Sequence, residues 1–457
     1  MNNEQILKEL KKQFSLDKET AKVLVVGLGK TGLSVAYYLR ELGIQFAIVD
    51  SRDKPPFNDT LLAEMPDIPV FTGGFDSAVF DLASHIVVSP GVSMGEPLIQ
   101  QAIASGVRSL SDIDLFACSV NKPVVAITGS NGKSTVTTML GAMVKASGKC
   151  TALGGNLGTP VLDLISDEVE IYVLELSSFQ LERTSQLNAV AATILNVSAD
   201  HLDRYENIVE YAEQKRKVYE GNGVMLFNAD DPVVIAMQEE GREALTFGLK
   251  HEADYTVMNS PEGEWLAIHG RPIIAVNDLL IAGVHNQANA LAALALGCVL
   301  GLPEEAMCKA LRTYKGLKHR MQLIANIAGV HWVNDSKATN VGACIAALQG
   351  FKGADVILIA GGDAKGADMS ELLPLLKEKV KAIILIGKDG DLLKKIVNES
   401  IPVFDVGTLK KAVKQATSLA EGGDTVLLSP ACASLDQFNN YQERGSVYEA
   451  EVKALVK

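Results

Sequence analysis

The chain has 457 residues, of which 47% are hydrophobic and 21% charged, and its formal net charge is −13. This length exceeds what one hydrophobic core usually supports and suggests about three domains. The acidic balance argues against a nucleic-acid-binding surface. We expect neither a membrane span nor a signal peptide, because the sequence lacks a long uncharged apolar run and its first residues are charged. Six cysteines without metal-type spacing predict reduced thiols and a cytoplasmic location.

Short apolar runs alternate with helical patterns along the whole chain, which predicts βαβ units and largely parallel sheets. We predict strands over 22–26, 45–49 and 85–88 in a first domain (1–111), then over 124–127, 171–174, 191–195 and 224–227 in a second (112–316). Alternation over 247–280 predicts an antiparallel edge, and a helix is expected over 286–300. The third domain (317–457) has predicted strands over 330–334, 356–360, 382–386, 403–405 and 425–428. Hinges are expected near Asp112 and Leu317.

A glycine-rich turn follows the first predicted strand. It reads Gly27-Leu28-Gly29-Lys30-Thr31-Gly32, and Asp50 ends the next predicted strand, where it could bind a ribose hydroxyl. Such a turn accepts any pyrophosphate, so a UDP derivative fits as well as NAD, and a turn that merely packs is a third interpretation. Ser89-Pro90-Gly91-Val92, after the third strand, either contacts the same ligand or is a plain turn.

A second glycine-rich loop lies between the strand predicted over 124–127 and a helix predicted over 136–146. Its residues are Gly129, Ser130, Asn131, Gly132, Lys133, Ser134 and Thr135. Backbone N–H groups at such a helix start favour phosphate. Lys133 could reach terminal phosphates, and the Ser134 hydroxyl could bind Mg²⁺. The loop is two residues shorter than the general phosphate-loop pattern, and a tight turn with a solvated lysine is the alternative.

Three further segments could complete a nucleotide and metal site. Glu175 follows the strand over 171–174 and is interpreted as a Mg²⁺ ligand rather than a helix cap. His201 follows the strand over 191–195, where it is either structural or a metal ligand. Asn286 and Asn289 share one face of a predicted helix and could bind an adenine edge or a sugar hydroxyl, or Asn286 could simply cap the helix.

Polar loops with basic side chains follow three strands of the third predicted domain. They span 334–340, 361–368 and 429–438. Since the carboxyl ends of parallel strands share one rim of a sheet, these loops suggest a site for a small acidic substrate beside the phosphates.

Together these motifs resemble the Mur ligases of bacterial cell-wall synthesis, which are ATP-dependent and form amide bonds. The resemblance covers essentially the whole chain through GSNGKST, ELSSFQL, DHLDRY, HNQAN, NDSKATN and GGDAKGAD. The segment SPACASLDQFNNYQERG is most similar to the D-glutamate-adding branch, and the DNPR-type motif of the diamino-acid-adding branch is absent from the sequence. The resemblance implies Rossmann-like first and third domains around a phosphate-loop ATPase-like central domain. It also implies a monomer that joins D-glutamate to UDP-N-acetylmuramoyl-L-alanine through an acyl phosphate.

The same resemblance assigns roles to individual residues. It implies ATP and two Mg²⁺ ions, with the metals held by Ser134, Glu175, His201 and Lys215. Lys215 matches a lysine that the family carbamylates with CO₂, and Lys217 is the alternative. Lys133 is implied in catalysis with Glu175, His201 and Lys215. The implied nucleotide contacts in addition to the phosphate loop are Asn286, Asn289, Arg320, Asp335 and Lys337. The implied substrate contacts are Gly29, Lys30, Thr31, Asp50, Arg52, Ser89, Asn156, Thr339, Lys365, Ser434 and Tyr441, where Tyr441 replaces a phenylalanine of some members.

Three other functions fit parts of the pattern. A ligase similar to folylpolyglutamate synthase would share the ATP chemistry, but the UDP-type first domain counts against it. The first glycine-rich turn alone would suit an NAD-dependent oxidoreductase. A non-catalytic nucleotide-binding regulator would not need the three loops of the third domain.

Overall fold

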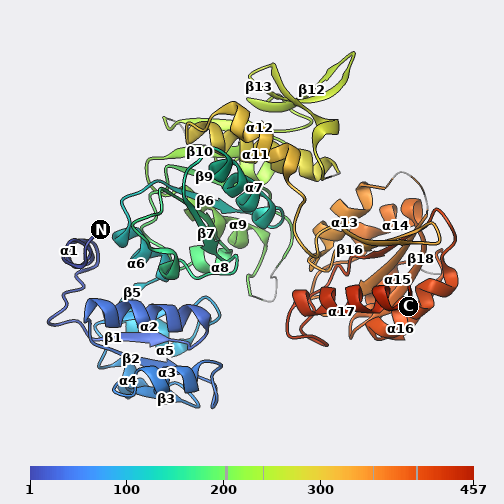
Figure 1. Ribbon diagram of the computed structural model, residues 1–457. Helices are drawn as coiled ribbons and strands as arrows, with labels where there is room; N and C mark the ends of the chain where they lie inside the picture. Colours follow the sequence, from blue (N-terminus) through green and yellow to red (C-terminus); the bar gives the residue numbers. More distant parts are fainter. Residues whose placement is uncertain are drawn as a thin grey trace.

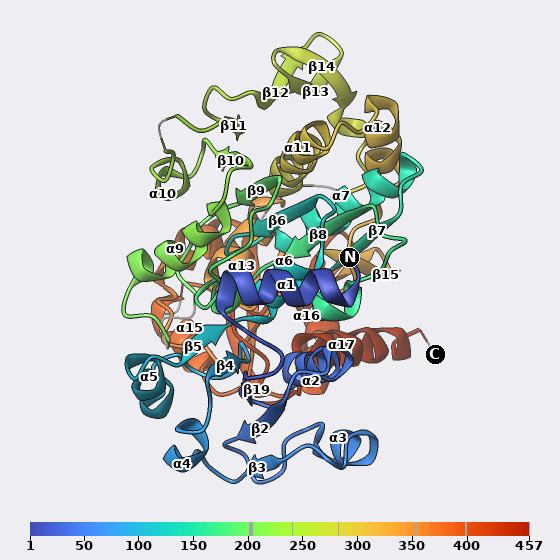
Figure 2. The ribbon, with the colours of Figure 1, turned by 90° about the vertical axis from the view of Figure 1, so that its left-hand side faces the viewer.

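The computed structural model describes residues 1–200, 204–239, 241–281, 283–351, 353, 355–397 and 400–456. Three open β-sheets follow one another along these residues, each flanked by helices (Figures 1 and 2). This confirms the α/β fold with mostly parallel sheets that the alternating pattern predicts. All six cysteines are unpaired. Among the described helices, none is long and apolar enough for a bilayer crossing.

The first sheet has five parallel strands in the order β3-β2-β1-β4-β5. Its strands are β1 Val23–Val26, β2 Phe46–Asp50, β3 Val70–Thr72, β4 His85–Val88 and β5 Arg108–Leu110, and its helices are α2 Lys30–Leu42, α3 Asn58–Glu64, α4 Ser77–Phe80 and α5 Pro97–Ala104. The central strand β1 is buried along its whole length, as expected for a parallel strand with helices on both faces. Helix α2 begins at Lys30, within the glycine-rich segment 27–32, so its N-terminus lies at the carboxyl ends of the strands.

Helix α1 (Asn3–Phe14) stands apart from this sheet and packs against α6 (Asp112–Ser119), which begins the central part of the chain (Figures 1 and 2). Its buried residues Ile6, Leu10 and Phe14 belong to the same apolar cluster as Phe116 and Cys118 of α6. The spacing of four residues places all three on one face of the helix. The N-terminal helix therefore contributes to the core of the central region.

The second sheet has nine strands in the order β14-β13-β12-β11-β10-β9-β6-β8-β7. The strands are β6 Val124–Thr128, β7 Thr151–Gly155, β8 Ile171–Glu175, β9 Ala191–Ile194, β10 Val224–Asn228, β11 Ala244–Phe247, β12 Tyr255–Ser260, β13 Gly263–Ile268 and β14 Arg271–Ala275. The helices are α7 Lys133–Ala146, α8 Ser178–Leu181, α9 Ile208–Arg216, α10 Pro232–Ile235, α11 Val284–Val299 and α12 Glu304–Thr313. Strands β12–β14 form the predicted antiparallel edge. Strand β6 lies between β8 and β9, so the loops after these three strands share one rim.

The third sheet has six strands in the order β15-β16-β20-β17-β18-β19. The strands are β15 Gln322–Ile327, β16 Val330–Asn334, β17 Val356–Gly361, β18 Val380–Ile386, β19 Val403–Gly407 and β20 Thr425–Leu428. The helices are α13 Val341–Gln349, α14 Leu373–Lys379, α15 Gly390–Val397, α16 Leu409–Leu419 and α17 Tyr441–Ala454. The last strand, β20, pairs with both β16 and β17. This pairing places the three predicted polar loops at neighbouring strand ends.

The structure adds β3, β5, β7, β11 and β15 to the strands predicted from sequence. Four of them lie at the outer ends of their sheets, and β15 and β3 are partly exposed along their length. Strands at a sheet edge bury fewer side chains, so they lack the continuous apolar run from which the central strands were predicted.

Candidate active site

The phosphate loop follows β6, as predicted, but α7 begins at Lys133, three residues before the predicted helix start, so Lys133, Ser134 and Thr135 form the first turn of the helix. Gly129 and Gly132 have φ values of +144° and +87°, which side-chain-bearing residues rarely adopt. A Cβ atom at Gly132 would lie 2.5 Å from Oδ1 of Asn289. In turn, Nδ2 of Asn289 donates to Oδ1 of Asn286 at 3.3 Å. The predicted amide pair on α11 therefore lies directly against the loop, which leaves no room for a side chain at position 132.

Lys133 is the first residue of α7, and its side chain folds back over its own loop. Nζ donates to the carbonyl oxygens of Gly129 at 2.6 Å and Ser130 at 2.8 Å. Burial lowers the pKa of Lys133, while the charge of Glu175 partly opposes this shift. Ser134 and Thr135 follow it in the first turn of α7, and both are buried. The cation of Lys133 is thus held at the place where bound phosphates would lie.

Glu175 is the last residue of β8, next to the phosphate loop in the sheet. Its Oε1 accepts a hydrogen bond from Nδ2 of Asn156 at 2.7 Å, while the buried Oε2 has no hydrogen-bond partner among the described residues. Burial would raise the pKa of Glu175, but the charges of Lys337 and Lys133 outweigh it and hold the pKa below its usual value. Ser177, not Glu175, caps α8. A buried carboxylate oxygen without a partner fits the role of a Mg²⁺ ligand.

Lys215 lies on α9, where its side chain is buried beneath the phosphate loop. Its Nζ donates to the carbonyl of Gly129 at 3.1 Å and lies 4.3 Å from the centre of the Tyr211 ring. Burial, together with the charge of Lys133, lowers the pKa of Lys215 well below its usual value. By contrast, Nζ of Lys217 donates to the carbonyl of Glu182 at 2.6 Å. Of the two lysines, Lys215 is the one that contacts the phosphate loop.

His201, the predicted imidazole ligand, lies outside the described residues. The described residues contain no group of three or more His, Cys, Asp or Glu side chains arranged for a metal ion. Asp200, which precedes His201 in the sequence, accepts hydrogen bonds from Nζ of Lys365 and Nδ2 of Asn340, each at 2.9 Å. Both partners belong to the third sheet region, so the segment after β9 joins the central and third parts of the molecule.

Loops of the third sheet region reach the phosphate loop directly. Lys337 contacts the Ser134 hydroxyl, and its Nζ lies 5.4 Å from the centre of the Tyr441 ring. Burial and the charge of Arg320 lower the pKa of Lys337 to about 7. Asp335 accepts hydrogen bonds from the Met321 backbone and the Ser429 hydroxyl, and burial raises its pKa to about 6. Two of the predicted nucleotide contacts therefore lie in a shared, poorly solvated environment.

The residues assigned to D-glutamate lie on neighbouring loops of the same rim. Thr339 follows Lys337 in the loop after β16, and Ser434 is buried in the loop after β20. Lys365, in the loop after β17, is paired with Asp200 across the boundary between the two regions. The loops after β16 and β20 are joined by Arg444, which donates to the carbonyls of Ser336 at 2.8 Å and Cys432 at 3.1 Å.

A cavity of about 310 Å³ lies between the central and third regions. Of the predicted residues it is lined by Asn131, Gly132, Asn289, Arg320 and Asp335. The other polar residues that line it were not predicted as site residues from the sequence; they are Asn196, Ser198, Asn228, Asp231 and His285. Asn228 ends β10, and Asn196 follows β9, so their places at strand ends were the signal that could have identified them.

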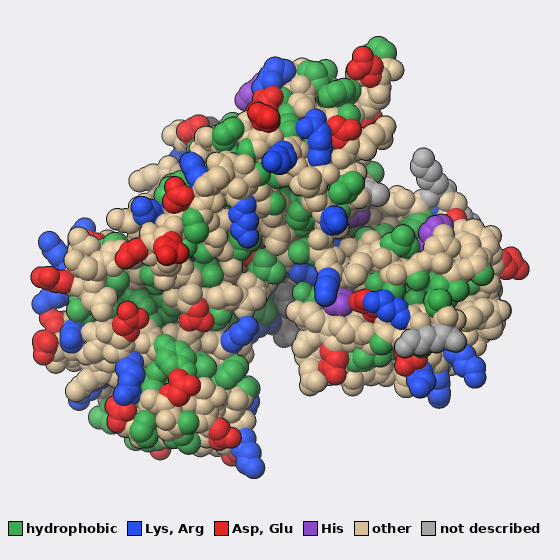
Figure 3. All heavy atoms as spheres, viewed as in Figure 1, with side chains coloured by type: hydrophobic (Ala, Val, Ile, Leu, Met, Phe, Trp, Pro, Cys, Tyr) green, Lys and Arg blue, Asp and Glu red, His purple; other side chains and the backbone are tan. Residues whose placement is uncertain are grey.

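The first sheet has its own cavity of about 520 Å³, at the carboxyl ends of β1, β2 and β4. All of the predicted UDP contacts line it: Gly29, Lys30, Thr31, Asp50, Arg52 and Ser89. The Asp50 carboxylate accepts from the Leu28 backbone at 2.7 Å and from the Arg52 side chain. Nζ of Lys30 donates to the carbonyl of Gly158, in the central region, at 2.9 Å. In Figure 3 the surface is deeply hollowed between the first and third regions, beneath the central one.

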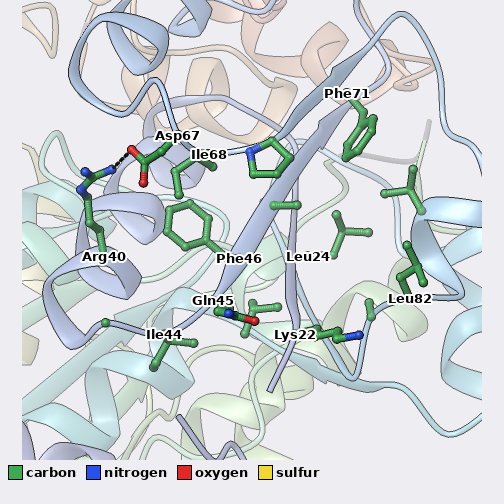
Figure 4. A pocket seen from close by; sticks show the side chains of 16 residues that line it. Lys22, Leu24, Arg40, Ile44, Gln45, Phe46, Asp67, Ile68, Phe71 and Leu82 are labelled. Atoms are coloured by element: carbon green, nitrogen blue, oxygen red, sulfur yellow. Dashed lines mark hydrogen bonds and ion pairs between the residues drawn. The ribbon is translucent and has the colours of Figure 1, made fainter. Parts of the chain in front are cut away.

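A larger cavity, of about 730 Å³, lies at the opposite end of the same sheet and contains none of the predicted site residues (Figure 4). It is lined mainly by apolar side chains such as Leu24, Phe46 and Leu82. The ion pair between Arg40 and Asp67 lies at its edge, with a distance of 2.9 Å between Nη1 and Oδ1. In open parallel sheets, ligands bind at the carboxyl ends of the strands, so we place the active site at the first two cavities.

The fold and the site define a multidomain α/β enzyme with a nucleotide-type phosphate loop that residues from a second domain complete. The chain belongs to the Mur ligase family, whose members are ATP-dependent amide-bond ligases that use Mg²⁺. Family models match residues 21–111 (Mur ligase MurD-like, N-terminal domain), 127–297 (Mur ligase middle domain) and 319–432 (Mur ligase, glutamate ligase domain). This assignment favours the Mur-ligase interpretation over the three alternatives considered above.

Two curated relatives share about half of their residues with this chain. The UDP-N-acetylmuramoylalanine--D-glutamate ligase of Methylococcus capsulatus is 51% identical over 437 residues, which is 95% of each chain. That of Pseudomonas aeruginosa is 46% identical over 439 residues, 94% of this chain and 98% of the relative.

Solved structures of more distant ligases share the fold. A pseudomurein peptide ligase type C from Methanothermus fervidus has a TM-score of 0.60 at 22% identity and covers 96% of this chain and 100% of its own. The UDP-N-acetylmuramate-alanine ligase of Thermotoga maritima has a TM-score of 0.60 at 18% identity, and the match covers 95% of this chain and 99% of the ligase. At these identities the likeness concerns the fold alone.

Proposed function

We propose that this enzyme joins D-glutamate to UDP-N-acetylmuramoyl-L-alanine and converts ATP to ADP and phosphate in doing so. The observation that carries the proposal is the meeting of three groups at one place: Lys133 of the phosphate loop, the buried carboxylate of Glu175, and Lys337 from the third region. The names of the two relatives supply the substrates. We place the UDP part in the cavity of the first domain (1–111), ATP between the central (112–316) and third (317–457) domains, and D-glutamate on the third.

The proposed chemistry has two steps. The alanyl carboxylate attacks the γ-phosphorus of ATP, ADP leaves, and an acyl phosphate forms. The amine of D-glutamate then attacks the acyl carbon, phosphate leaves, and the amine loses a proton as the amide forms. Lys133 and Lys337 neutralise the phosphate oxygens, because two anions must approach one another in the first step. Closure of the domains around the site would exclude water and protect the acyl phosphate.

Mg²⁺ would further neutralise the phosphates and orient them. Ser134 and Glu175 are the described residues that would hold it, and the unpartnered Oε2 of Glu175 fits that role. We assign His201 and a carbamylated Lys215 to a second ion. Carbamylation requires a neutral amine, which the burial of Lys215 favours. Asn156 would orient Glu175 through its hydrogen bond and contact the muramoyl substrate. The cytoplasmic location and the monomeric state expected from the sequence stay predictions.

Phosphate release from ATP by the purified protein tests this function. We expect release to require both UDP-N-acetylmuramoyl-L-alanine and D-glutamate, and the product to contain one glutamate per phosphate released. Lys133→Ala is the control, because it should lower turnover by orders of magnitude and leave the fold intact. Release that responds to a folate substrate or to another amino acid, but not to D-glutamate, would refute the substrate assignment.

A further inference from the structure

The segment from Val88, the last residue of β4, to Val92 is called loop 88–92, and its residues Ser89 to Val92 form one wall of the cavity in the first domain. It is packed tightly against the glycine-rich turn. The Ser89 hydroxyl donates to the carbonyl of Gly27 at 2.7 Å, and a Cβ atom at Gly27 would lie 2.8 Å from Cγ2 of Val92. The position of this loop therefore also fixes the turn on which a pyrophosphate would lie.

Arg183 holds this loop from the central domain. It follows α8, and its side chain is fully buried, with 0% exposure. Nη1 donates to the carbonyl of Ser89 at 2.6 Å and to that of Val88 at 3.4 Å, while Nη2 donates to the carbonyl of Val92 at 3.3 Å. One guanidinium thus bonds three carbonyl oxygens of the same loop. A lysine could not do this, because its ammonium lacks the planar fork of donors.

Arg204 reaches the same loop from a different segment. Its Nη2 donates to the carbonyl of Val92 at 2.9 Å, and its guanidinium carbon lies 4.3 Å from the centre of the Phe179 ring. Glu182 forms ion pairs with both arginines, at 3.2 Å to Arg183 and 3.5 Å to Arg204. This carboxylate partly compensates the cost of placing two cations side by side with little solvent.

The two arginines follow the two central segments that carry proposed metal-site residues. Arg183 lies eight residues after Glu175, at the end of the short helix α8, and Arg204 follows the segment that contains Asp200. Each segment therefore begins at the phosphate site in the central domain. It ends at the wall of the nucleotide-sugar cavity in the first domain. This arrangement connects the two sites through a few buried hydrogen bonds.

We propose that Arg183, supported by Arg204, is a positioning residue that fixes the loop 88–92 as a wall of the nucleotide-sugar site. Affinity for the UDP-linked substrate then depends on the central domain and not on the first domain alone. This inference rests on the proposed function, since it takes the cavity of the first domain as the UDP site. Neither arginine is assigned contact with a substrate.

The test compares Arg183→Met and Arg183→Lys with the wild type. Calorimetry gives the affinity for UDP-N-acetylmuramoyl-L-alanine, and steady-state kinetics give KM for that substrate and for ATP. We expect Arg183→Met to weaken binding of the UDP substrate about tenfold, as the loss of a buried charge-assisted contact implies, while KM for ATP changes less than about twofold. Arg183→Lys should recover part of the loss, because one carbonyl contact is retained.

Arg242→Met is the matched control. This arginine also donates to two backbone carbonyls, those of Tyr219 at 2.6 Å and Gly223 at 3.0 Å, but it lies within the central domain and does not contact the loop. It should lower the melting temperature without changing KM for the UDP substrate. If Arg183→Met does not fold, Arg204→Met replaces it, because that side chain is 18% exposed and its loss is better tolerated.

The outcomes separate this inference from the proposed function. A wild type that does not bind UDP-N-acetylmuramoyl-L-alanine would overturn the proposed function. A wild type that binds it, with arginine variants that bind equally well, would overturn the positioning role alone. Equal weakening of the UDP substrate and ATP, accompanied by a lower melting temperature, would also overturn it and leave Arg183 a purely structural residue.

Discussion

Lys215 is a lysine in a buried site that disfavours its charged form. Its side chain is buried, lies next to Lys133, and has a pKa well below the usual value for lysine. An ammonium there would repel Mg²⁺, whereas a carbamate would bind it, so we expect activity to depend on this modification. Lys215→Ala should be nearly inactive, and acetate should partly restore turnover by filling the vacated space with a carboxylate.

Lys217→Ala serves as the control for this experiment, because Lys217 contacts the Glu182 carbonyl and not the phosphate loop. It should keep most of the activity and gain nothing from acetate. Full activity of Lys215→Ala in the absence of any carboxylic acid would remove Lys215 from the proposed metal site.

Asp112 is a buried carboxyl group at the start of α6, and neither of its oxygens has a hydrogen-bond partner among the described residues. Burial raises its pKa to about 6, although the charge of Arg183 opposes the shift. Because the pKa is higher in the folded than in the unfolded chain, this group lowers the free energy of unfolding as pH rises from about 4 to about 6. Above about pH 6 the reduction in the free energy of unfolding is complete, at about 3 kcal/mol. Below about pH 4 this reduction in the free energy of unfolding disappears.

Asp112→Asn should therefore gain stability relative to the wild type as the pH rises through this window, which denaturant unfolding at pH 4 and pH 8 would measure. Asp114→Asn is the control in the same helix. Its Oδ1 accepts from the backbones of Ser185 and Gln186, and its Oδ2 accepts from the backbone of Ser111, each at 2.8 Å. An amide nitrogen cannot accept the second of these contacts, so Asp114→Asn should destabilise the protein at pH 8. A stability difference between Asp112→Asn and wild type that does not change with pH would contradict the assignment.

At the scale of elements, the strand–loop–helix unit from β6 to α7 has a conformation that requires glycine. Gly132→Ala would introduce a left-handed alanine, at about 1 kcal/mol, and a clash with Asn289 and Leu195 at about 1–3 kcal/mol more. We expect a lower melting temperature and a higher KM for ATP. Gly148→Ala tests the backbone cost alone, since Gly148 has φ of +85° and open space around its Cβ position. If both variants show the same KM for ATP, the loop does not bind the nucleotide.

The elements that could be predicted from the sequence are those whose local pattern of apolar residues matches their burial in the folded protein. Strands β4, β16 and β20 have the predicted bounds, since each is a short and mostly buried run with several apolar residues. The edge strands β3 and β15 did not show such a run. An isolated arginine such as Arg183 would be interpreted from the sequence as a solvent-exposed residue. Its neighbours in the sequence do not indicate that its guanidinium will bond three carbonyl groups of a distant loop. Contacts between domains, such as Asp200 with Lys365, cannot be predicted from the pattern of either segment.

At the scale of the whole molecule, the third domain already contacts the central one around the phosphate loop. Lys365 and Asp200 form an ion pair of 2.9 Å with little solvent exposure. If Lys365 turns to the side-chain carboxylate of D-glutamate during the reaction, Lys365→Met should raise KM for D-glutamate about tenfold and KM for ATP much less. Steady-state kinetics with each substrate varied in turn would measure both constants.

Lys388→Met provides the comparison for Lys365. It removes an exposed ion pair of 3.2 Å with Asp363 within the third domain. Both KM values should stay near those of the wild type, because exposed pairs of this kind contribute little. Equal increases in both KM values for Lys365→Met would assign Lys365 to the nucleotide or to the contact between domains instead.

The packing of α1 on α6 has a consequence for the order in which the protein folds during its synthesis. Asp112, the first residue of α6, follows Phe14 by 98 residues (112 − 14). At roughly 5–20 residues per second, a ribosome needs roughly 5–20 s to make that stretch. During this time Ile6, Leu10 and Phe14 have no native partner on α6. Meanwhile the first sheet can complete itself from residues 23–110 without them. Helix α1 therefore waits for its partner until translation reaches α6, and during that time its three apolar side chains can bind chaperones.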